Sequence, residues 1–222
     1  MEIKVLRNVM EANDEIASQI RHLLREKSVL AFNLIGSPGA GKTSLLERTI
    51  ERLKPQLSLA VIEGDIATTR DAERIARFDV PVIQLHTDGE CHLHVNLVFQ
   101  SLSDLNLGDI DILFIENVGN MVCPVEFDLG EFAKVGVLSV PEGDDKPLKY
   151  PLLFRKSGCI VLNKIDLLPY VDFDRARFYS DIENIDANLK VIEVSCKTGE
   201  GIEDWAAWIS GMRISELKGS YE

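Results

Sequence analysis

Apolar residues recur at two different spacings along this chain, and the spacing changes near residue 29. Before that point, Ile16, Ile20, Leu23 and Leu24 repeat at helical spacing while charged residues fall elsewhere, which predicts one amphipathic helix. After it, short β-rich runs alternate with helical stretches. We therefore predict an N-terminal helical arm over 1–28 and one domain over 29–222. The arm has two interpretations, packing on the domain or docking of a partner.

The β-rich runs predict a parallel sheet, because each is followed by a helical stretch. These runs read VLAFNLI, LAVIEG, VPVIQL, DILFIE, VGVLSV, CIVLNK and LKVIEVS. The fold class is α/β, a doubly wound, mostly parallel sheet with helices on both faces. Its ligand crevice is expected beyond the carboxyl ends of the strands. The polar stretch 141–150, PEGDDKPLKY, is expected to be the one long loop, a mobile surface segment.

A glycine-rich loop follows the first apolar run. Residues 36–43 read GSPGAGKT, which is the pattern G-x-x-x-x-G-K-[ST] in the strand-to-helix context of a phosphate-binding loop. Its glycines let backbone N–H groups converge on phosphate oxygens, and the next helix adds its positive end. Lys42 supplies a charge for the β- and γ-phosphates, and Thr43 offers a hydroxyl to Mg²⁺. The sequence therefore predicts a P-loop NTPase.

The tetrapeptide NKID at 163–166 indicates which base is bound. It follows the run CIVL, and Asp166 there can accept hydrogen bonds from N1 and the amino group of guanine, which adenine does not offer. Asn163 is expected to orient the loop and Lys164 to cover the base. NKID alone also fits an ordinary turn, but SCKTGEG follows at 195–201, where the Cys196 backbone is expected to meet the guanine carbonyl. The predicted nucleotide-binding residues are Gly36, Ser37, Pro38, Gly39, Ala40, Gly41, Lys42, Thr43, Ser44, Asn163, Lys164, Asp166, Ser195, Cys196 and Lys197.

Acidic residues follow two of the predicted strands. DILFIENVG ends in Glu116-x-x-Gly119, where GTPases usually have Asp-x-x-Gly, and the longer Glu116 side chain is expected to reach Mg²⁺ directly or through water. Asp65 and Asp71 are expected to hold the hydration shell of the metal or to orient the attacking water, although Asp71 also fits a solvated helix start. We predict Lys42, Asp65 and Glu116 as catalytic residues, and Thr43, Asp65, Asp71 and Glu116 around Mg²⁺. Asn120 stands where some GTPases have a water-orienting glutamine, which predicts slow turnover.

Cysteine and histidine residues that can bind transition metals precede and follow the 111–119 segment in the sequence. Cys91 and His92 are adjacent, and Cys123 and His94 extend the set; thiolate with imidazole suits Ni²⁺ or Zn²⁺. Core packing of free cysteines is the alternative. Cys123 lies at most about 14 Å beyond Gly119 along the chain, so movement caused by the γ-phosphate should reach it. Cys91, His92 and Cys123 are too few for a closed site, which favours ligands shared by two chains about a two-fold axis. Metal occupancy would then depend on dimerisation, and dimerisation on nucleotide.

Charge and hydropathy restrict the partners. The chain has 36 Asp and Glu against 24 Lys and Arg, a formal net charge of −12, which disfavours nonspecific binding to nucleic acid or anionic lipid. No segment approaches the roughly 20 apolar residues of a membrane span, and the N-terminus lacks the pattern of a secretory signal. We expect a cytoplasmic protein. The four scattered cysteines do not suggest a disulfide framework.

Together these motifs resemble the HypB family of hydrogenase nickel-incorporation GTPases, in the class of P-loop proteins that dimerise around nucleotide. The resemblance runs from Val29 through GSPGAGKT, EGDIATTRDAERI, ECHLH, ENVGNMVCP, EGDDKPLKYP, NKID and SCKTGEG, of which ENVGNMVCP and EGDDKPLKYP are the most specific. It implies GTP-controlled nickel delivery to [NiFe]-hydrogenase and a GTP-promoted homodimer with Cys91, His92 and Cys123 at a metal site in its interface. It also implies a small nickel metallochaperone that docks near the arm, and the hydrogenase large subunit as recipient.

Two departures and three alternatives qualify this expectation. The chain lacks the cysteine-rich or histidine-rich start of some members, so a tight N-terminal nickel store is not expected. His94 stands where the family commonly has an acidic residue, which fits either an altered metal preference or a surface substitution. The first alternative is a urease-maturation GTPase, which normally lacks ENVGNMVCP. The second is a regulatory module with a structural zinc, which would bind metal equally in both nucleotide states. The third, an ATP-dependent enzyme, is disfavoured by NKID. The sequence does not identify the cellular metal, the handover route, the water-activating residue, or the roles of His94 and 141–150.

Overall fold

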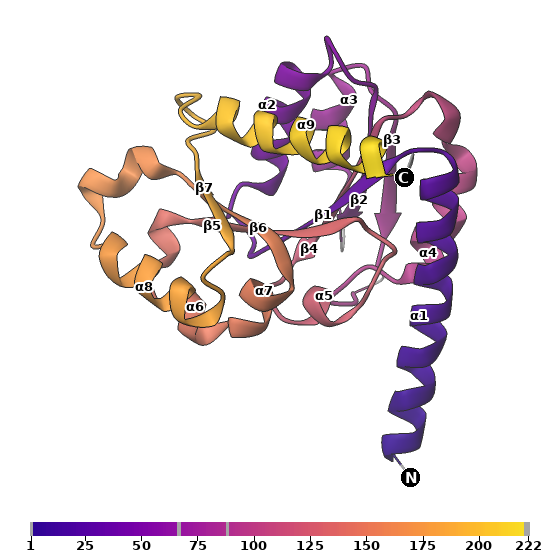
Figure 1. Cartoon of the computed structure of the whole chain (residues 1–222), viewed down its shortest axis with the longest axis horizontal. Coiled ribbons are helices and arrows are strands. Elements are labelled where there is room, and N and C mark those ends of the chain that lie inside the picture. Colours follow the sequence, from indigo (N-terminus) through magenta and orange to yellow (C-terminus); the bar gives the residue numbers. More distant parts are fainter. Residues whose placement is uncertain (1, 66–67, 88, 220–222) are drawn as a thin grey trace.

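Seven strands form one sheet at the centre of the molecule, in the order β3-β2-β4-β1-β5-β6-β7 (Figure 1). The computed structural model describes residues 2–65, 68–87 and 89–219. Every strand pair in the sheet is parallel. The strands are β1 (Leu30–Gly36), β2 (Leu59–Asp65), β3 (Val82–His86), β4 (Ile112–Gly119), β5 (Ala133–Ser139), β6 (Ser157–Asn163) and β7 (Lys190–Glu193). The chain winds outward from β1 in both directions, which confirms the predicted doubly wound fold.

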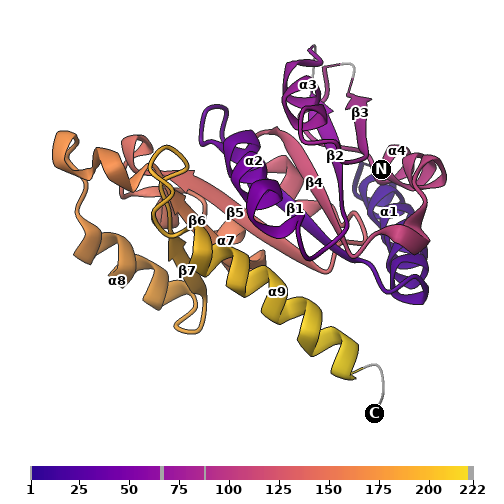
Figure 2. The same cartoon turned by 90° about the horizontal axis from the view of Figure 1, so that it is seen from above.

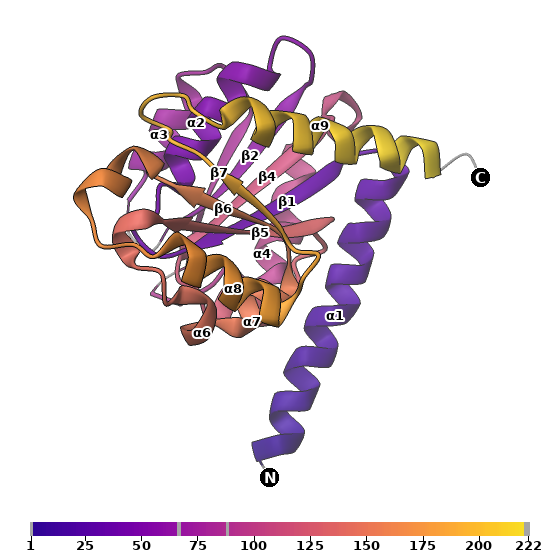
Figure 3. The ribbon, with the colours of Figure 1, turned by 60° about the vertical axis from the view of Figure 1, so that its left-hand side comes forward.

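Helices cover both faces of the sheet, and Figure 3 shows α2 and α9 on the side opposite α6–α8. The central strand β1 is buried along its whole length, because a parallel sheet packs helices on each side. The longer helices are α1 (Glu2–Glu26), α2 (Lys42–Leu53), α3 (Arg70–Ala76), α4 (Val95–Ser101), α8 (Arg175–Ile185) and α9 (Ile202–Gly219). Short helices are α5 (Cys123–Glu126), α6 (Lys146–Lys149) and α7 (Pro151–Lys156).

Alternate side chains of β1 enter different cores. Phe32 and Leu34 pack with α2, α3 and α9 on one face, while Ala31 packs with α1 and α4 on the other. Ile35 joins a third cluster with α7 and α8 on that second face. Figure 2 shows α1 and α4 toward the β2 and β3 side of the sheet and α7 and α8 toward the β6 and β7 side. The core is therefore divided into three clusters, and the strand ends that carry the motifs lie where those clusters meet the surface.

The predicted apolar face of the arm is confirmed. Ile20 and Leu24 are buried against the domain, and Ile16 and Leu23 pack beside them. Asn13 Nδ2 donates to the Asp128 carbonyl oxygen at 2.9 Å. The first turns of α1 extend past the domain (Figure 1). The division into an arm at 1–28 and a domain at 29–222 stays a prediction, since the second half of α1 shares the domain core.

The expectation of one long loop at 141–150 is wrong. A 3₁₀ helix over Val140–Glu142 begins this stretch, and α6 occupies Lys146–Lys149. Ser139 and Glu142 form a capping box, in which each side chain meets the backbone of the other, and Lys149 pairs with Asp145 at 2.5 Å. These local contacts give the polar side chains of this stretch partners within short helices. Their polar character alone had predicted a loop. Among the described helices, none has the length and apolar character needed to cross a bilayer.

Candidate functional site

Two adjoining cavities open at the carboxyl ends of the strands. One, of about 490 Å³, is lined by the glycine-rich loop and by acidic residues of β2, α3 and β4. The other, of about 580 Å³, is lined by α2, NKID and the 195–201 loop. Gly41, Ser44 and Lys164 line both. The cavities therefore form one cleft. We call the end lined by the glycine-rich loop and the acidic residues the phosphate end, and the end lined by NKID, where the sequence predicts guanine recognition, the base-reading end.

The glycine-rich loop begins α2 in the geometry that phosphate binding requires. Gly41 lies in the left-handed region at φ 99°, and a Cβ there would stand 2.3 Å from Asn163 Nδ2. Lys42 Nζ donates to the carbonyl of Gly36 at 3.2 Å, so the ammonium group lies over the loop. Ser37 Oγ donates to the Glu142 carboxylate. Among the predicted residues, Pro38, Gly39, Gly41, Lys42, Thr43 and Ser44 line the phosphate end.

Asn163 connects three loops that are distant in sequence. Its Nδ2 donates to the Ala40 carbonyl at 3.0 Å, while its Oδ1 accepts from Lys164 N at 2.7 Å and Cys196 N at 3.3 Å. Lys164 Nζ donates to the Gly39 carbonyl at 2.6 Å. The asparagine orients its loop, as the sequence suggested, and also ties the phosphate loop to the 195–201 loop.

Asp166 lies at the base-reading end with its carboxylate already oriented. Ser195 Oγ donates to Asp166 Oδ1 at 2.6 Å, and Lys197 and Cys196 line the same cavity. Burial raises the pKa of the Cys196 thiol to about 11, so this thiol is neutral at ordinary pH and packs against the core. Asp166 itself lines this cavity.

Glu116 is a buried acidic residue that contacts the end of the phosphate loop. It is 5% exposed, and its Oε1 accepts from Thr43 Oγ1 at 2.9 Å. Its Oε2 is buried without a hydrogen-bond partner. Gly119, three residues on, allows β4 to approach the loop, because a Cβ there would stand 2.6 Å from Pro38 Cγ. A carboxylate with one free oxygen beside a threonine hydroxyl is a donor set that suits Mg²⁺.

Glu63 is a site residue that the sequence reasoning missed. It lies on β2 directly opposite Glu116 on β4, is 1% exposed, and lines the phosphate end. Burial and the Glu116 charge raise the pKa of Glu63 to about 11, so it holds a proton and hydrogen-bonds to Glu116. The available signal was a glutamate inside a strand that is otherwise apolar, since charged residues are rarely buried unless they are paired.

Asp65 and Asp71 both line the phosphate end, at its outer edge. Asp65 closes β2 and accepts from Thr68 N at 3.2 Å and Thr68 Oγ1 at 3.1 Å. Asp71, in the first turn of α3, pairs with Arg74 at 2.9 Å. Arg74 also binds Glu47 of α2 at 2.7 Å. The fold therefore brings all four acidic groups, including Glu63, to one end of the cleft.

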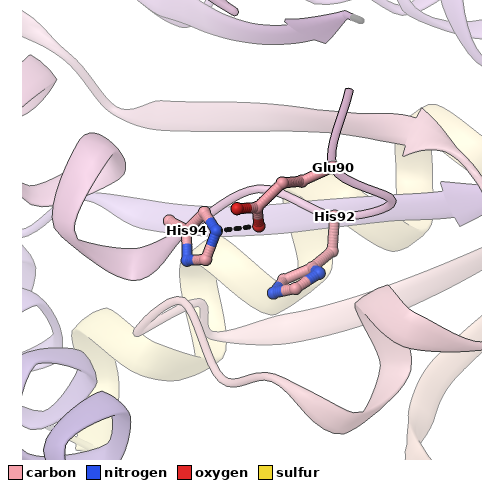
Figure 4. Close-up of side chains that lie close together, drawn as sticks. All are labelled: Glu90, His92 and His94. Atoms are coloured by element: carbon pink, nitrogen blue, oxygen red, sulfur yellow. Dashed lines mark hydrogen bonds and ion pairs between the residues drawn. The ribbon is translucent and has the colours of Figure 1, made fainter. Parts of the chain in front are cut away.

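The predicted transition-metal ligands lie together, next to the carboxyl end of β4. Cys91 Sγ is 3.8 Å from His92 Nδ1, and a hydrogen bond with Cys123 raises the pKa of the Cys91 thiol. Cys91 is exposed and Cys123 is half-buried. Within the described chain, the donor atoms that converge most closely are those of Glu90, His92 and His94, which lie within 4.8 Å of one another (Figure 4).

β4 and the turn after it contact both sites. Glu116 meets Thr43 at the phosphate end, whereas Asn117 Oδ1 accepts from Leu93 N at 3.2 Å. Asn120 Nδ2 donates to the Cys91 carbonyl at 3.2 Å. Asn117 Nδ2 also donates to Asn33 Oδ1 at 3.3 Å, inside the sheet. Neighbouring residues of one strand thus touch the nucleotide cleft and the metal-ligand segment in turn.

The parallel sheet, the phosphate loop and the NKID aspartate define a P-loop nucleotide-binding protein of the GTPase kind. The CobW/HypB/UreG nucleotide-binding domain family matches residues 30–193. The hydrogenase maturation factor HypB of Azotobacter vinelandii is 45% identical over 216 residues, which are 97% of this chain and 71% of that protein.

Solved structures agree with the sequence matches. The hydrogenase maturation factor HypB of Archaeoglobus fulgidus superposes with a TM-score of 0.85 at 39% identity, covering 91% of this chain and 99% of the other. HypB from Helicobacter pylori, crystallised in complex with nickel, gives 0.88 at 31% identity, covering 92% and 96%. The chain therefore belongs to the HypB family of hydrogenase maturation factors.

Proposed function

We propose that this chain hydrolyses GTP slowly in the cytoplasm and uses its nucleotide state to control nickel delivery during [NiFe]-hydrogenase maturation. The proposal rests on family membership and on one observation above all, the contacts of β4. Glu116 touches the phosphate loop, and Asn117 and Asn120 hold the backbone of the Cys91–Leu93 segment. A shift of β4 on loss of the γ-phosphate would move both asparagines.

Each side chain of the cleft has a separate task in this proposal. Asp166, oriented by Ser195, selects guanine, and Lys42 places its charge against the β- and γ-phosphates. Thr43 and Glu116 would hold Mg²⁺, with Asp65 and Asp71 around its hydration shell, and the bound ion would supply positive charge to the transferred phosphoryl group. Asp65 orients the attacking water. The protonated Glu63 carboxyl fixes Glu116 by a hydrogen bond.

Metal handover in the proposal requires two chains. Cys91, His92 and Cys123 supply three ligands per chain, and the adjacent Val122 is an exposed apolar side chain, 54% accessible. A second copy of the chain would cover Val122 and complete the coordination of Ni²⁺ or Zn²⁺. A small nickel metallochaperone docking near the arm, and the hydrogenase large subunit, are the proposed partners.

The test is the affinity of the purified chain for Ni²⁺ and Zn²⁺ with GDP and with a non-hydrolysable GTP analogue, with oligomeric state recorded in the same samples. We expect the affinity to differ between nucleotides, to follow dimerisation, and to lose this dependence in Cys123→Ala. Cys159→Ala is the matched control, because that thiol is buried in the core cluster beneath α2 and α9. Equal affinities in both states would contradict delivery and indicate a structural metal site.

A further inference from the structure

Glu90, His92 and His94 lie on one short segment that two other elements hold in place. Thr87 Oγ1 donates to the Glu90 carbonyl at 3.0 Å, which anchors the start of the segment. At its end, Leu93 is fully buried and its N–H donates to Asn117 Oδ1. His92 and His94 flank this buried leucine, and His94 begins α4 with an extended backbone. The positions of the three side chains are therefore set by the fold.

The three side chains face one another, as Figure 4 shows. His94 Nε2 is paired with the Glu90 carboxylate, and the His92 and His94 ring centroids are 4.9 Å apart. One donor atom from each of the three lies within 4.8 Å of the others. Zinc-to-donor bonds are about 2.0–2.2 Å, so donors within 4.8 Å of one another are close to the spacing that one shared ion requires, and the half-exposed Glu90 and His94 side chains have room to adjust.

His92 provides a second, independent sign of a ligand. The residue is only 9% exposed, and its Nε2 is buried without a hydrogen-bond partner. Its ring is stacked on Phe127 at 4.0 Å between centroids, so the ring plane is fixed. Leaving a buried polar nitrogen unpaired is unfavourable. A cation between His92 and His94 would give that nitrogen a partner.

We propose that Glu90, His92 and His94 bind one divalent transition-metal ion within a single chain. Two imidazoles and a carboxylate suit Ni²⁺ or Zn²⁺ and leave positions open to water, which favours an exchangeable ion over a structural one. This site needs neither Cys91 nor Cys123, but it shares His92 with them. It therefore gives a metal ion a binding place beside the thiols before a second chain arrives. Only the identification of the ion as nickel cargo rests on the proposed function.

The test uses the full chain with GDP, freed of metal and titrated with Ni²⁺ alone against a chromogenic chelator. In Cys91→Ala/Cys123→Ala, we expect one Ni²⁺ per monomer to remain, with an X-ray absorption spectrum that shows nitrogen and oxygen ligands and no sulfur. Adding His94→Gln should weaken that binding at least tenfold, and adding Glu90→Gln should also weaken it. Both side chains are about half exposed, and His94 makes no side-chain cap to α4, so neither change removes a buried core residue.

The matched control is His22→Gln in the same double-alanine background. His22 also stands beside a glutamate one helical turn away, Glu26, at 3.7 Å, but it lies on α1, away from the segment. Loss of all Ni²⁺ binding in Cys91→Ala/Cys123→Ala would overturn the proposal, as would equal affinities for the His94→Gln and His22→Gln chains. The proposed delivery function fails on a different result, namely an unchanged affinity of the unmodified chain between GDP and the GTP analogue.

Discussion

Neighbouring residues at the carboxyl end of β4 contact two sites that are built in different ways. At the nucleotide cleft, side chains from three loops are joined by hydrogen bonds through Asn163, and the key carboxylates are buried or already oriented. At the metal segment, Cys91 and Glu90 are exposed, and two asparagines supply the contacts to β4. The first site is thus tied together by buried and oriented side chains, whereas in the second Cys91 and Glu90 are exposed beside the buried His92.

This difference matches what each ligand requires. Electrostatic catalysis needs donors that are oriented before the substrate arrives, so the cleft is cross-linked. A metal that must leave needs ligands that can move and positions that another group can enter. Side-chain hydrogen bonds between loops are therefore concentrated at the nucleotide cleft, whereas the predicted metal-ligand segment is held through its backbone by Asn117 and Asn120.

The largest expected effect concerns base recognition. Asp166→Ala should weaken GDP binding at least about 100-fold, because two hydrogen bonds to a charged carboxylate are lost. Nucleotide titration by calorimetry measures this, and Ni²⁺ affinity without nucleotide should not change. Asp172→Ala, an exposed carboxylate just beyond the same loop, is the control. Equal losses in both variants would show that Asp166 does not read the base.

Cutting the link between the three loops should affect stability as well as binding. Asn163→Ala removes hydrogen bonds to Ala40, Lys164 and Cys196 and leaves buried partners unsatisfied. We expect the free energy of unfolding to fall by about 1–3 kcal/mol. Urea denaturation with and without GDP would show this, with exposed Asn188→Ala as control. A stability equal to that of the control would show that the Asn163 hydrogen bonds do not stabilise the fold.

Glu63 should make stability depend on pH. The folded chain keeps a proton on Glu63, whose pKa is raised to about 11 by burial and by Glu116, whereas the unfolded chain releases it above about pH 4.3. The folded state then binds more protons, so the free energy of unfolding falls as pH rises from that value toward 11, by at most about 1.4 kcal/mol per unit.

Glu63→Gln should remove this dependence, because the amide donates to Glu116 without titrating. Between pH 5 and pH 8 the variant should gain up to about 4 kcal/mol of unfolding free energy over the unmodified chain. Thermal unfolding at the two pH values measures the gain, and Glu183→Gln, an exposed glutamate of α8, should show none. A gain of the same size at both pH values would mean that Glu63 is ionised in the fold.

The smallest expected effect concerns the link between the nucleotide cleft and the Cys91–Leu93 segment. Asn120→Ala removes one contact to the Cys91 backbone, so the ratio of Ni²⁺ affinities between GDP and a GTP analogue should shrink by about 2- to 10-fold. GDP affinity should stay unchanged, because Asn120 lies outside both cavities of the cleft. Exposed Asn96→Ala on α4 is the control. An unchanged ratio would show that Asn120 does not transmit the nucleotide state to the metal ligands, and the coupling would then have to pass through Asn117 or Cys123.

Much of the nucleotide cleft was predictable because its chemistry is local. GSPGAGKT and NKID each place glycine, lysine or aspartate at set offsets after an apolar strand, and a parallel sheet brings all such strand ends to one edge. Cys91, His92 and Cys123 were also predicted as neighbours, and the fold places them side by side. The strand and helix order followed from apolar spacing in the same way.

Other features depended on which strands became neighbours. Glu63 is opposite Glu116 only because β2 pairs with β4 in that register, and the strands are far apart in sequence. Glu142 likewise reaches Ser37, 105 residues away, and Asn117 reaches Leu93, 24 residues away. Spacing along a chain reports the period of one element, whereas pairing depends on packing summed over the whole core. Local sequence was therefore enough for the motifs and their order, while the protonated glutamate, the asparagine links and the meeting of Glu90, His92 and His94 required the folded chain.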